Sequence, residues 1–139
     1  MKNTILLTVT FLAALFLSSV NAQTQSINEI TSNKYALKNL VAGIHSDNLG
    51  VKRSSVYFAG KYKIAETEDE LISQLKKEED PSTRILIALV LFEMGSEEGL
   101  NEVKDISMND EDSKVRRITT QIYNDYLLND SESTVFVTE

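Results

Sequence analysis

The sequence predicts an all-α fold, an α-helical solenoid of about three helix–turn–helix units. The first observation behind this prediction is a repeat, because Asn48, Asp80 and Asp112 are evenly spaced along the chain. The same interval separates Asn48 from Asp80 and Asp80 from Asp112, and we call this interval the repeat period. The second observation is that the residues after each of these positions place apolar side chains at the spacing of one helix face. A fixed period between about 20 and 50 residues is typical of repeat architectures, in which each unit covers the apolar face of its neighbour.

The three repeated positions have residue types that begin helices. The side-chain oxygen of Asn or Asp accepts a hydrogen bond from a free backbone N–H of the first turn, and Pro81 stands where its missing N–H costs nothing. Gly95 is placed to end the middle helix. The predicted core positions of the three long helices are Val51, Ser54, Ser55, Phe58, Ala59 and Tyr62; Thr83, Leu86, Ile87, Val90, Leu91 and Met94; and Val115, Ile118, Thr119, Ile122, Tyr123 and Tyr126.

A shorter helix is expected before each long one. Thr67 and Glu70 have the spacing of a capping box at the start of the middle short helix. Ser96 precedes two glutamates at the start of the last short helix, where the helix dipole favours negative charge. The apolar residues of these helices are Leu37, Leu40, Val41 and Ile44; Leu71, Ile72 and Leu75; and Leu100, Val103 and Ile106.

The first 22 residues have the pattern of a secretory signal peptide. Lys2 precedes an apolar run from Ile5 to Leu17, and small or modest residues lead up to an expected cleavage after Ala22. At about 1.5 Å per residue the run covers only about 20 Å of a roughly 30 Å hydrocarbon core, which disfavours a membrane anchor. We expect an exported protein, periplasmic or extracellular, with a signal peptide at 1–22, a leader at 23–33, a helical repeat domain at 34–128, a flexible tail at 129–139 and no membrane span after removal of the signal.

Composition narrows the classes of function. Fourteen Lys and Arg stand against twenty-one Asp and Glu, and the net charge of -7 disfavours nucleic acid as a partner. With no Cys, an exported domain of this size depends on core packing alone. His45 is the only His, and a Gly-rich phosphate loop and a nucleophile elbow are both missing, so common catalytic chemistries lack their usual parts. We expect neither an enzyme nor a cofactor.

The sequence resembles HEAT-repeat and armadillo proteins. The resemblance rests on the residue at the start of each long helix and on those three and four positions later: Asn48, Val51 and Lys52; Asp80, Thr83 and Arg84; Asp112, Val115 and Arg116. It spans about residues 34–128. The resemblance implies an α-α superhelix of about three antiparallel helix pairs. It also implies a structural ladder, formed by Asp80, Asp112, Arg84 and Arg116, that ties neighbouring units together.

The basic residues of the long helices have a second interpretation. Lys52, Arg53, Arg84, Arg116 and Arg117 could form an anion-binding stripe. The neighbouring acids and the net negative charge favour the structural ladder instead.

Three other groups of polar residues are expected to be structural. Asp110-Glu111-Asp112 lacks the ligand spacing and the central Gly of a calcium loop, so we interpret it as a turn that ends in a helix cap. Glu66 and Glu70 form a carboxylate pair of a kind that surface helices commonly carry. His45 is expected at a surface or helix C-terminal position rather than as a metal ligand, and no metal site is expected.

The middle long helix carries a second apolar stripe, formed by Ile85, Leu89 and Phe92, away from its predicted core face. Tyr57 stands at the position of the first long helix that corresponds to Leu89. One interpretation is that a central helix has neighbours on most sides and needs apolar residues there. The other is that these four residues line an exposed groove that accepts a partner's helix or extended segment.

From these observations we expect an exported, non-catalytic helical-repeat module that binds another protein as a scaffold or a regulator. Polar residues in the outer units, where the middle unit has Leu86, Ile87 and Ala88, are expected of capping ends. The alternatives are a structural protein of the cell envelope, or an enzyme or small-ligand-binding domain, for which the sequence offers less support.

Overall fold

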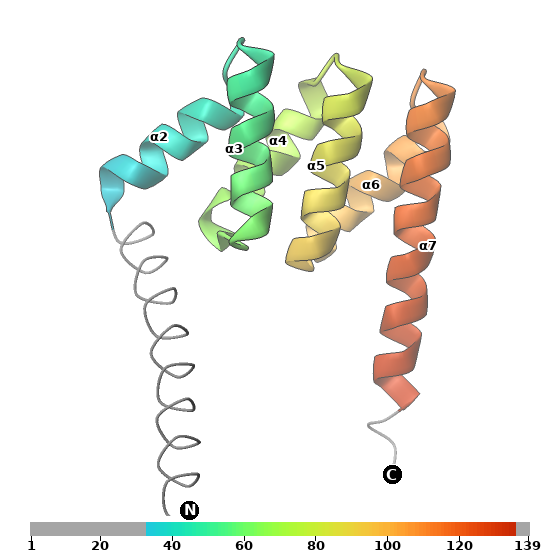
Figure 1. Ribbon diagram of the computed structural model, residues 1–139. Helices are drawn as coiled ribbons and strands as arrows, with labels where there is room; N and C mark the ends of the chain where they lie inside the picture. The colour runs from blue at the N-terminus through green and yellow to red at the C-terminus, as the bar shows by residue number, and fades with distance from the viewer. Residues whose placement is uncertain (1–32, 136–139) are drawn as a thin grey trace, which may run out of the picture. The chain divides into compact units, whose positions relative to one another are not determined.

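The computed structural model describes residues 33–135, and these residues are helical throughout except for short turns (Figure 1). The elements are α2 (Lys34–Ile44), α3 (Leu49–Lys61), a short 3-10 helix η1 (Ala65–Thr67), α4 (Glu68–Lys77), α5 (Pro81–Met94), α6 (Glu97–Asn109) and α7 (Ser113–Val135). No strand occurs in the described residues, so the all-α prediction is confirmed. The predicted signal peptide and nearly all of the predicted leader lie outside the described residues.

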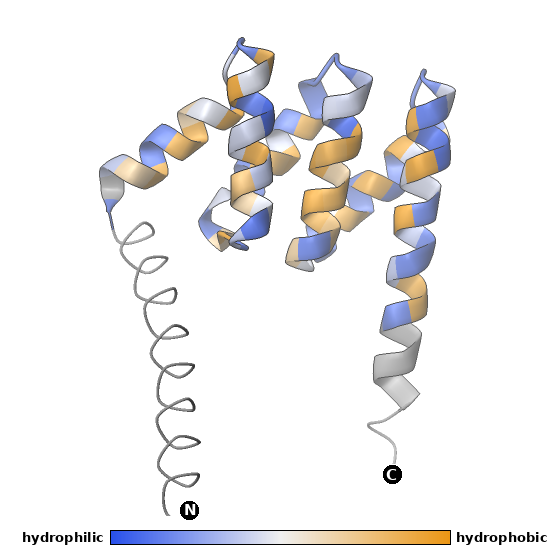
Figure 2. Ribbon diagram, viewed as in Figure 1, coloured by the Kyte–Doolittle hydropathy of each residue, from blue (hydrophilic) through white to orange (hydrophobic). Residues whose placement is uncertain are grey.

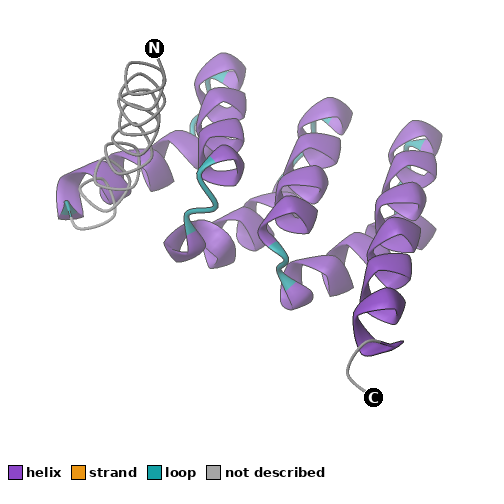
Figure 3. Ribbon diagram, turned by 60° about the horizontal axis from the view of Figure 1, so that its bottom comes forward, coloured by secondary structure: helices purple, strands orange, loops and turns teal. Residues whose placement is uncertain are grey.

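The chain divides into two compact parts between Leu37 and Lys38, and the packing described below belongs to the second part. Within it, α3, α5 and α7 lie side by side in one layer, with α4 and α6 in a second layer behind them (Figures 1 and 3). α5 contacts α3 on one side and α7 on the other, α4 packs on α5, and α6 packs on α7. α5 is therefore the central helix of its layer.

Three equivalent side chains cap the long helices, as the sequence predicts. The bonds run from Val51 N to Asn48 Oδ1 (3.1 Å), from Thr83 N to Asp80 Oδ1 (2.7 Å) and from Val115 N to Asp112 Oδ1 (3.1 Å). Each bond satisfies one backbone N–H that the helix itself leaves free. The three starts are thus built in the same way, one repeat period apart.

The other predicted helix ends have different outcomes. Gly95 adopts a left-handed φ of 73° and ends α5, as predicted, and Ser96 Oγ accepts a hydrogen bond from Gly99 N (2.8 Å) at the start of α6. The capping box at Thr67 is wrong. Thr67 ends η1 in a helical conformation, and its hydroxyl donates to Ile64 O (2.7 Å) instead of capping α4.

The hydrophobic core lies between the two layers. The apolar side chains with no more than 2% exposure are Ile44, Val56, Ala59, Ile64, Leu71, Leu75, Ile87, Ala88, Leu91, Leu100, Val103 and Val115. The predicted core face is wrong at Ser54, which is exposed, and at Val51, which is 48% exposed. The corresponding residue of α5, Thr83, is buried against α3, whereas α3 is the first helix of its layer in the described residues and Val51 has no such neighbour.

α3 and α5 approach each other closely at Gly60. A Cβ atom at this position would lie 2.6 Å from Val90 Cγ2 and 2.8 Å from Val90 Cγ1, which is closer than two such atoms pack. A glycine inside a helix costs about 1 kcal/mol relative to alanine. The close approach explains why glycine occupies this buried position despite that cost.

α7 continues to Val135, beyond Leu128, where the sequence analysis ended the helical domain. Neither Pro nor Gly occurs after Gly99, so nothing in the sequence stops the helix at Leu128. The segment expected as a flexible tail at 129–139 is therefore helical as far as Val135. Residues 136–139 lie outside the described residues.

Candidate functional site

A surface groove of about 260 Å³ lies between α3 and α5. Its lining residues are Tyr57, Gly60, Lys61, Lys63, Leu86, Leu89, Val90 and Glu93. Tyr57 and Leu89, which the sequence analysis placed at corresponding positions, are 57% and 43% exposed. Figure 2 shows that α5 is hydrophobic through its middle turns, where it borders α3. The structure thus brings two of the four predicted partner-binding residues together on one surface.

The other two predicted residues lie differently. Phe92 is half-buried and packs against the hydrophobic core, and Ile85 is half-buried as well. Neither lines the groove. The flanks of α5 are covered by α3 and α7, so only a narrow outward strip of the helix, which includes Leu89, stays accessible. Leu89 is thus exposed, whereas neighbouring helices half-bury Ile85 and Phe92.

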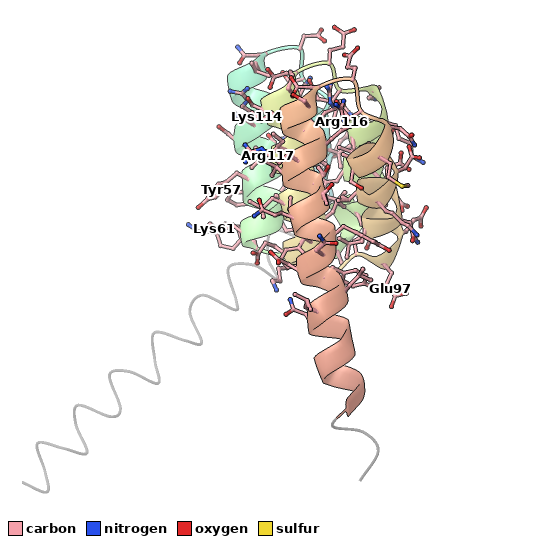
Figure 4. All side chains as sticks on the ribbon, turned by 90° about the vertical axis from the view of Figure 1, so that its right-hand side faces the viewer. Tyr57, Lys61, Glu97, Lys114, Arg116 and Arg117 are labelled. Carbon is pink, nitrogen blue, oxygen red and sulfur yellow. The ribbon has the colours of Figure 1, made fainter. Side chains whose placement is uncertain are left out.

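Charged groups stand at the rim of the groove. Lys61 Nζ lies 5.9 Å from the ring centroid of Tyr57 and 5.6 Å from that of Tyr62, distances at which a cation and an aromatic face attract each other. Tyr57 and Lys61 project from the same side of α3 (Figure 4). The lining residues include one acid, Glu93, and two lysines, Lys61 and Lys63. The groove therefore combines an apolar floor with a rim that favours a carboxylate.

The position of α7 that corresponds to Leu89 of α5 lacks an apolar side chain. Gln121 stands one repeat period after Leu89 and is exposed. The apolar pair that Tyr57 and Leu89 form is consequently not repeated between α5 and α7.

Three cations of the predicted anion-binding stripe are taken up by ion pairs between neighbouring units. The pairs are Lys52 Nζ with Glu78 Oε2 (2.7 Å), Arg53 Nη2 with Asp80 Oδ1 (2.6 Å) and Arg84 Nε with Asp110 Oδ2 (2.8 Å). The stripe is therefore wrong as a continuous anion site. Arg116 and Arg117 differ from the other three, because neither has an acidic side chain as a partner within the described residues.

Arg84 pairs with a different acid from the one that the resemblance implies. Arg84 pairs with Asp110 and not with Asp112, whose side chain accepts hydrogen bonds from the backbone N–H groups of Lys114 and Val115. Arg84 Nη2 donates to Asp110 Oδ1 (2.9 Å). Arg84 Nε lies 2.8 Å from Oδ2, close enough for charge pairing, although its N–H does not point along that line.

Arg84 is buried, with 7% of its surface exposed, so hydrogen bonds and an ion pair must compensate its charge for the loss of water. Its Nη1 donates to the backbone oxygens of Glu78 (2.9 Å) and Glu79 (3.0 Å), within the turn that precedes α5. Arg116 repeats this arrangement one period later, with Nη1 donating to the backbone oxygens of Asp110 and Glu111 (3.1 Å). Asp110-Glu111-Asp112 is thus a turn that ends in a helix cap, as predicted.

Of the two acids that pair with α3, Glu78 and Asp80, Glu78 is the more enclosed. Burial by itself raises the pKa of Glu78, but hydrogen bonds from Lys52, the Asp80 backbone and Gln74 together outweigh it and hold the pKa below its ordinary value of 4.5. These donors lie 2.7, 3.0 and 2.7 Å from the carboxylate oxygens. Glu78 is therefore a charged structural residue at neutral pH.

His45 lies beside this cluster and joins the end of α2 to α4. Its Nδ1 is 2.8 Å from Gln74 Oε1 and its Nε2 is 2.6 Å from Glu70 Oε2. No pattern in the sequence pointed to these contacts, since both partners are distant from His45 along the chain. The partner of the Glu70 carboxylate is therefore His45. The described residues contain no group of His, Cys, Asp and Glu side chains arranged to hold a metal ion.

Replacing Asp80 with Asn is expected to remove a pH-dependent part of the stability while keeping the helix cap. Hydrogen bonds from Arg53 and from the Thr83 side chain lower the pKa of Asp80 from 3.8 to about 2. The ionised carboxylate therefore stabilises the fold above pH 3.8, and this contribution is lost as the pH falls towards 2. Because Asp80 is partly exposed, screening leaves a contribution of about 1 kcal/mol at pH 7.

Urea unfolding at several pH values between 7 and about 2 tests this expectation. Asn48 shows that asparagine caps a long helix in this chain, so Asp80→Asn isolates the charge. Asp80→Ala removes the cap as well and is expected to cost about 1 kcal/mol more at every pH. A difference between Asp80→Asn and the unaltered protein that persists undiminished at the lowest pH would contradict the assignment.

Comparison of the chain with protein-family models, with curated proteins and with solved structures finds no match. Among the described residues, no helix has both the length and the apolar content that a membrane crossing requires.

Proposed function

We propose that this protein is an exported, non-catalytic helical-repeat module of the HEAT-like type, which binds another protein through the groove between α3 and α5. The observation that carries the proposal is the exposure of Tyr57 and Leu89 on one apolar surface between two packed helices. Large apolar side chains gathered at one exposed place, with charges around them, are typical of interaction sites.

The repeat part of this proposal is supported by contacts that recur along the chain. Helix caps and turn-spanning hydrogen bonds both recur after one repeat period, as Arg84 and Arg116 illustrate. In a repeat protein each unit contacts its neighbours, and the units at the ends carry polar outer faces. Thr120 on α7 is exposed where the corresponding Ala88 and Val56 are buried, which agrees with a capping role for the last unit.

The chemistry of the groove defines the partner segment. Its apolar floor takes up an aliphatic or aromatic side chain, and the ammonium groups of Lys61 and Lys63 at the rim favour a carboxylate beside that side chain. We therefore propose that the partner presents a helix or an extended segment with an apolar residue next to Asp or Glu.

Replacing Leu89 with Glu is expected to abolish partner capture without unfolding the protein. The substitution places a charge on the apolar floor, yet position 89 is exposed, so the fold itself loses little. Affinity capture from the exported fraction, read by mass spectrometry, should show at least a tenfold loss of the captured protein, a change of about 1.4 kcal/mol or more. The melting temperature should fall by no more than about 4 °C.

Gln121→Glu is the matched control, because residue 121 occupies the corresponding exposed position of α7 and receives the same charge. It is expected to leave capture unchanged. Two results would contradict the proposed site: equal loss in both variants, which would indicate a general charge effect, or a large drop in melting temperature for Leu89→Glu, which would indicate a core position.

Export is a separate part of the proposal and rests on the charged start, apolar run and small residues of the first 22 positions. The expected mature protein begins at Gln23. Its intact mass, measured after expression of the full chain and recovery of the exported fraction, should correspond to residues 23–139. An uncleaved protein confined to the cytoplasm would contradict this assignment.

A further inference from the structure

The first junction between units shows how two adjacent cations hold an acidic turn. Lys52 and Arg53 of α3 contact Glu78 and Asp80, which stand two positions apart just before α5. Arg53 Nε also donates to Thr83 Oγ1 (3.0 Å) in the first turn of that helix. The two cations therefore bind a turn with the pattern acid, any residue, acid, followed at once by a helix.

α7 carries the same pair of cations at the corresponding positions, and no acidic side chain of the described residues pairs with them. Arg116 and Arg117 stand two repeat periods after Lys52 and Arg53. Arg116 uses Nη1 for the backbone of its own turn, as Arg84 does, but no acidic side chain meets its remaining donors, and Arg117 is exposed without a partner within the described residues. Figure 4 faces α7 and shows both arginines near the start of the helix, with no described helix in front of them.

We propose that Arg116 and Arg117 form a second docking site, which binds an acidic turn of another protein. The segment bound has two carboxylates two positions apart just before a helix, the arrangement that the chain itself uses at its first junction. Guanidinium groups suit this role because they present several donors in a fixed plane to carboxylate oxygens. This site lies on a different helix from the groove between α3 and α5 and does not depend on it.

A second copy of this chain, stacked end to end, does not supply the required acids. Its α3 end would present the turn before α3, where Ser46 and Asn48 occupy the positions of Glu78 and Asp80. Position 120 of α7 is also polar, because Thr120 stands where Val56 and Ala88 are buried in the layer. Charge complementarity, rather than apolar packing, therefore selects the occupant, and binding should weaken with salt.

The capped hexapeptide EEDPST, which copies residues 78–83, tests the proposal against the control peptide QQNPST. Titration into the full chain at about 20 mM salt, where surface charges are weakly screened, is followed by NMR of the arginine Nε–Hε groups. The acidic peptide should shift the signals of Arg116 and Arg117 saturably, and the neutral peptide should not. Absence of a shift with EEDPST, or equal shifts with both peptides, would overturn the proposal.

Arg117→Gln is the test variant, because Arg117 makes no contact that the fold needs. It should raise the dissociation constant for EEDPST at least about fivefold, while Lys114→Gln, the same charge change three positions earlier, should change it less than about twofold. Equal weakening by the two variants would show that the peptide responds only to the positive charge of this region in general, and it would overturn the proposal. A dimer of this chain that Arg117→Gln dissociates would also overturn it, because the occupant would then be a second copy.

Discussion

Replacing Asp110 with Ala is expected to lower the free energy of unfolding by about 3–5 kcal/mol, because it leaves the buried charge of Arg84 unpaired. The side chain of Asp110 is 5% exposed, so water does not readily take its place. Asp110 Oδ1 also accepts a hydrogen bond from Asp112 N (2.8 Å), which holds the turn before α7. Urea unfolding followed by far-ultraviolet circular dichroism measures the loss.

Two further variants separate the buried pair from surface charge in general. Lys76, which is exposed, and Glu102, which is partly exposed, form an ion pair at 3.2 Å, and Glu102→Ala is expected to cost less than about 1 kcal/mol. Combining Asp110→Ala with Arg84→Met should recover part of the stability, because no buried charge then remains without a partner. A cost for Asp110→Ala as small as that for Glu102→Ala would show that Arg84 is not held as described.

Replacing Leu91 with Ala is expected to cost about 2–5 kcal/mol, because it opens a cavity where α5 packs on α6. Leu91 is fully buried, and a Cβ atom at Gly99 would lie only 2.8 Å from Leu91 Cδ2, so the surroundings of the side chain are tightly filled. The matched control is Leu89→Ala, two positions away on the exposed strip of the same helix. It should cost less than about 1 kcal/mol.

The two leucine variants together locate the faces of α5. Thermal unfolding should place the melting temperature of Leu91→Ala at least about 10 °C below that of Leu89→Ala. Similar melting temperatures for the two variants would mean that Leu89 belongs to the core, and the proposed groove would then lose its apolar floor.

Helix starts and the core of the central helix could be predicted from the sequence because both depend on residues near one another in the chain. Asn48, Asp80 and Asp112 each bond to a backbone N–H three positions later, so spacing alone identifies them. The face of α5 that contains Ile87 and Leu91 follows from helical periodicity. Thr67 failed as a cap because η1, which the sequence pattern does not reveal, places it in a helical conformation.

Contacts between units could not be predicted in the same way. The sequence shows acids at both Asp110 and Asp112, and only the relative placement of α5 and the turn before α7 decides that Arg84 reaches the first. His45 is a similar case, because its partners lie on α4, which the chain reaches only after passing through α3 and η1. Val51 has an apolar side chain at a predicted core position, but α3 is the first helix of its layer in the described residues and the side chain stays 48% exposed.

The candidate groove was predicted in part. Helical spacing places Tyr57 and Leu89 on corresponding strips of two helices, and adjacency of α3 and α5 then brings them to one surface. Ile85 and Phe92 share the stripe with Leu89, but the positions of α3 and α7 decide how much of each remains exposed. The correspondence of Arg116 and Arg117 with Lys52 and Arg53 is visible in the repeat period, yet its meaning depends on the ion pairs of the first junction.

Site-specific photo-cross-linking from position 89 tests the proposed binding groove most directly. Leu89 is replaced with benzoylphenylalanine, and Gln121 is replaced in a parallel variant that serves as the control on α7. Illumination should link position 89, and not position 121, to one partner segment that carries an apolar residue next to Asp or Glu. Equal labelling from the two positions, or a linked segment without such a pair, would contradict the account.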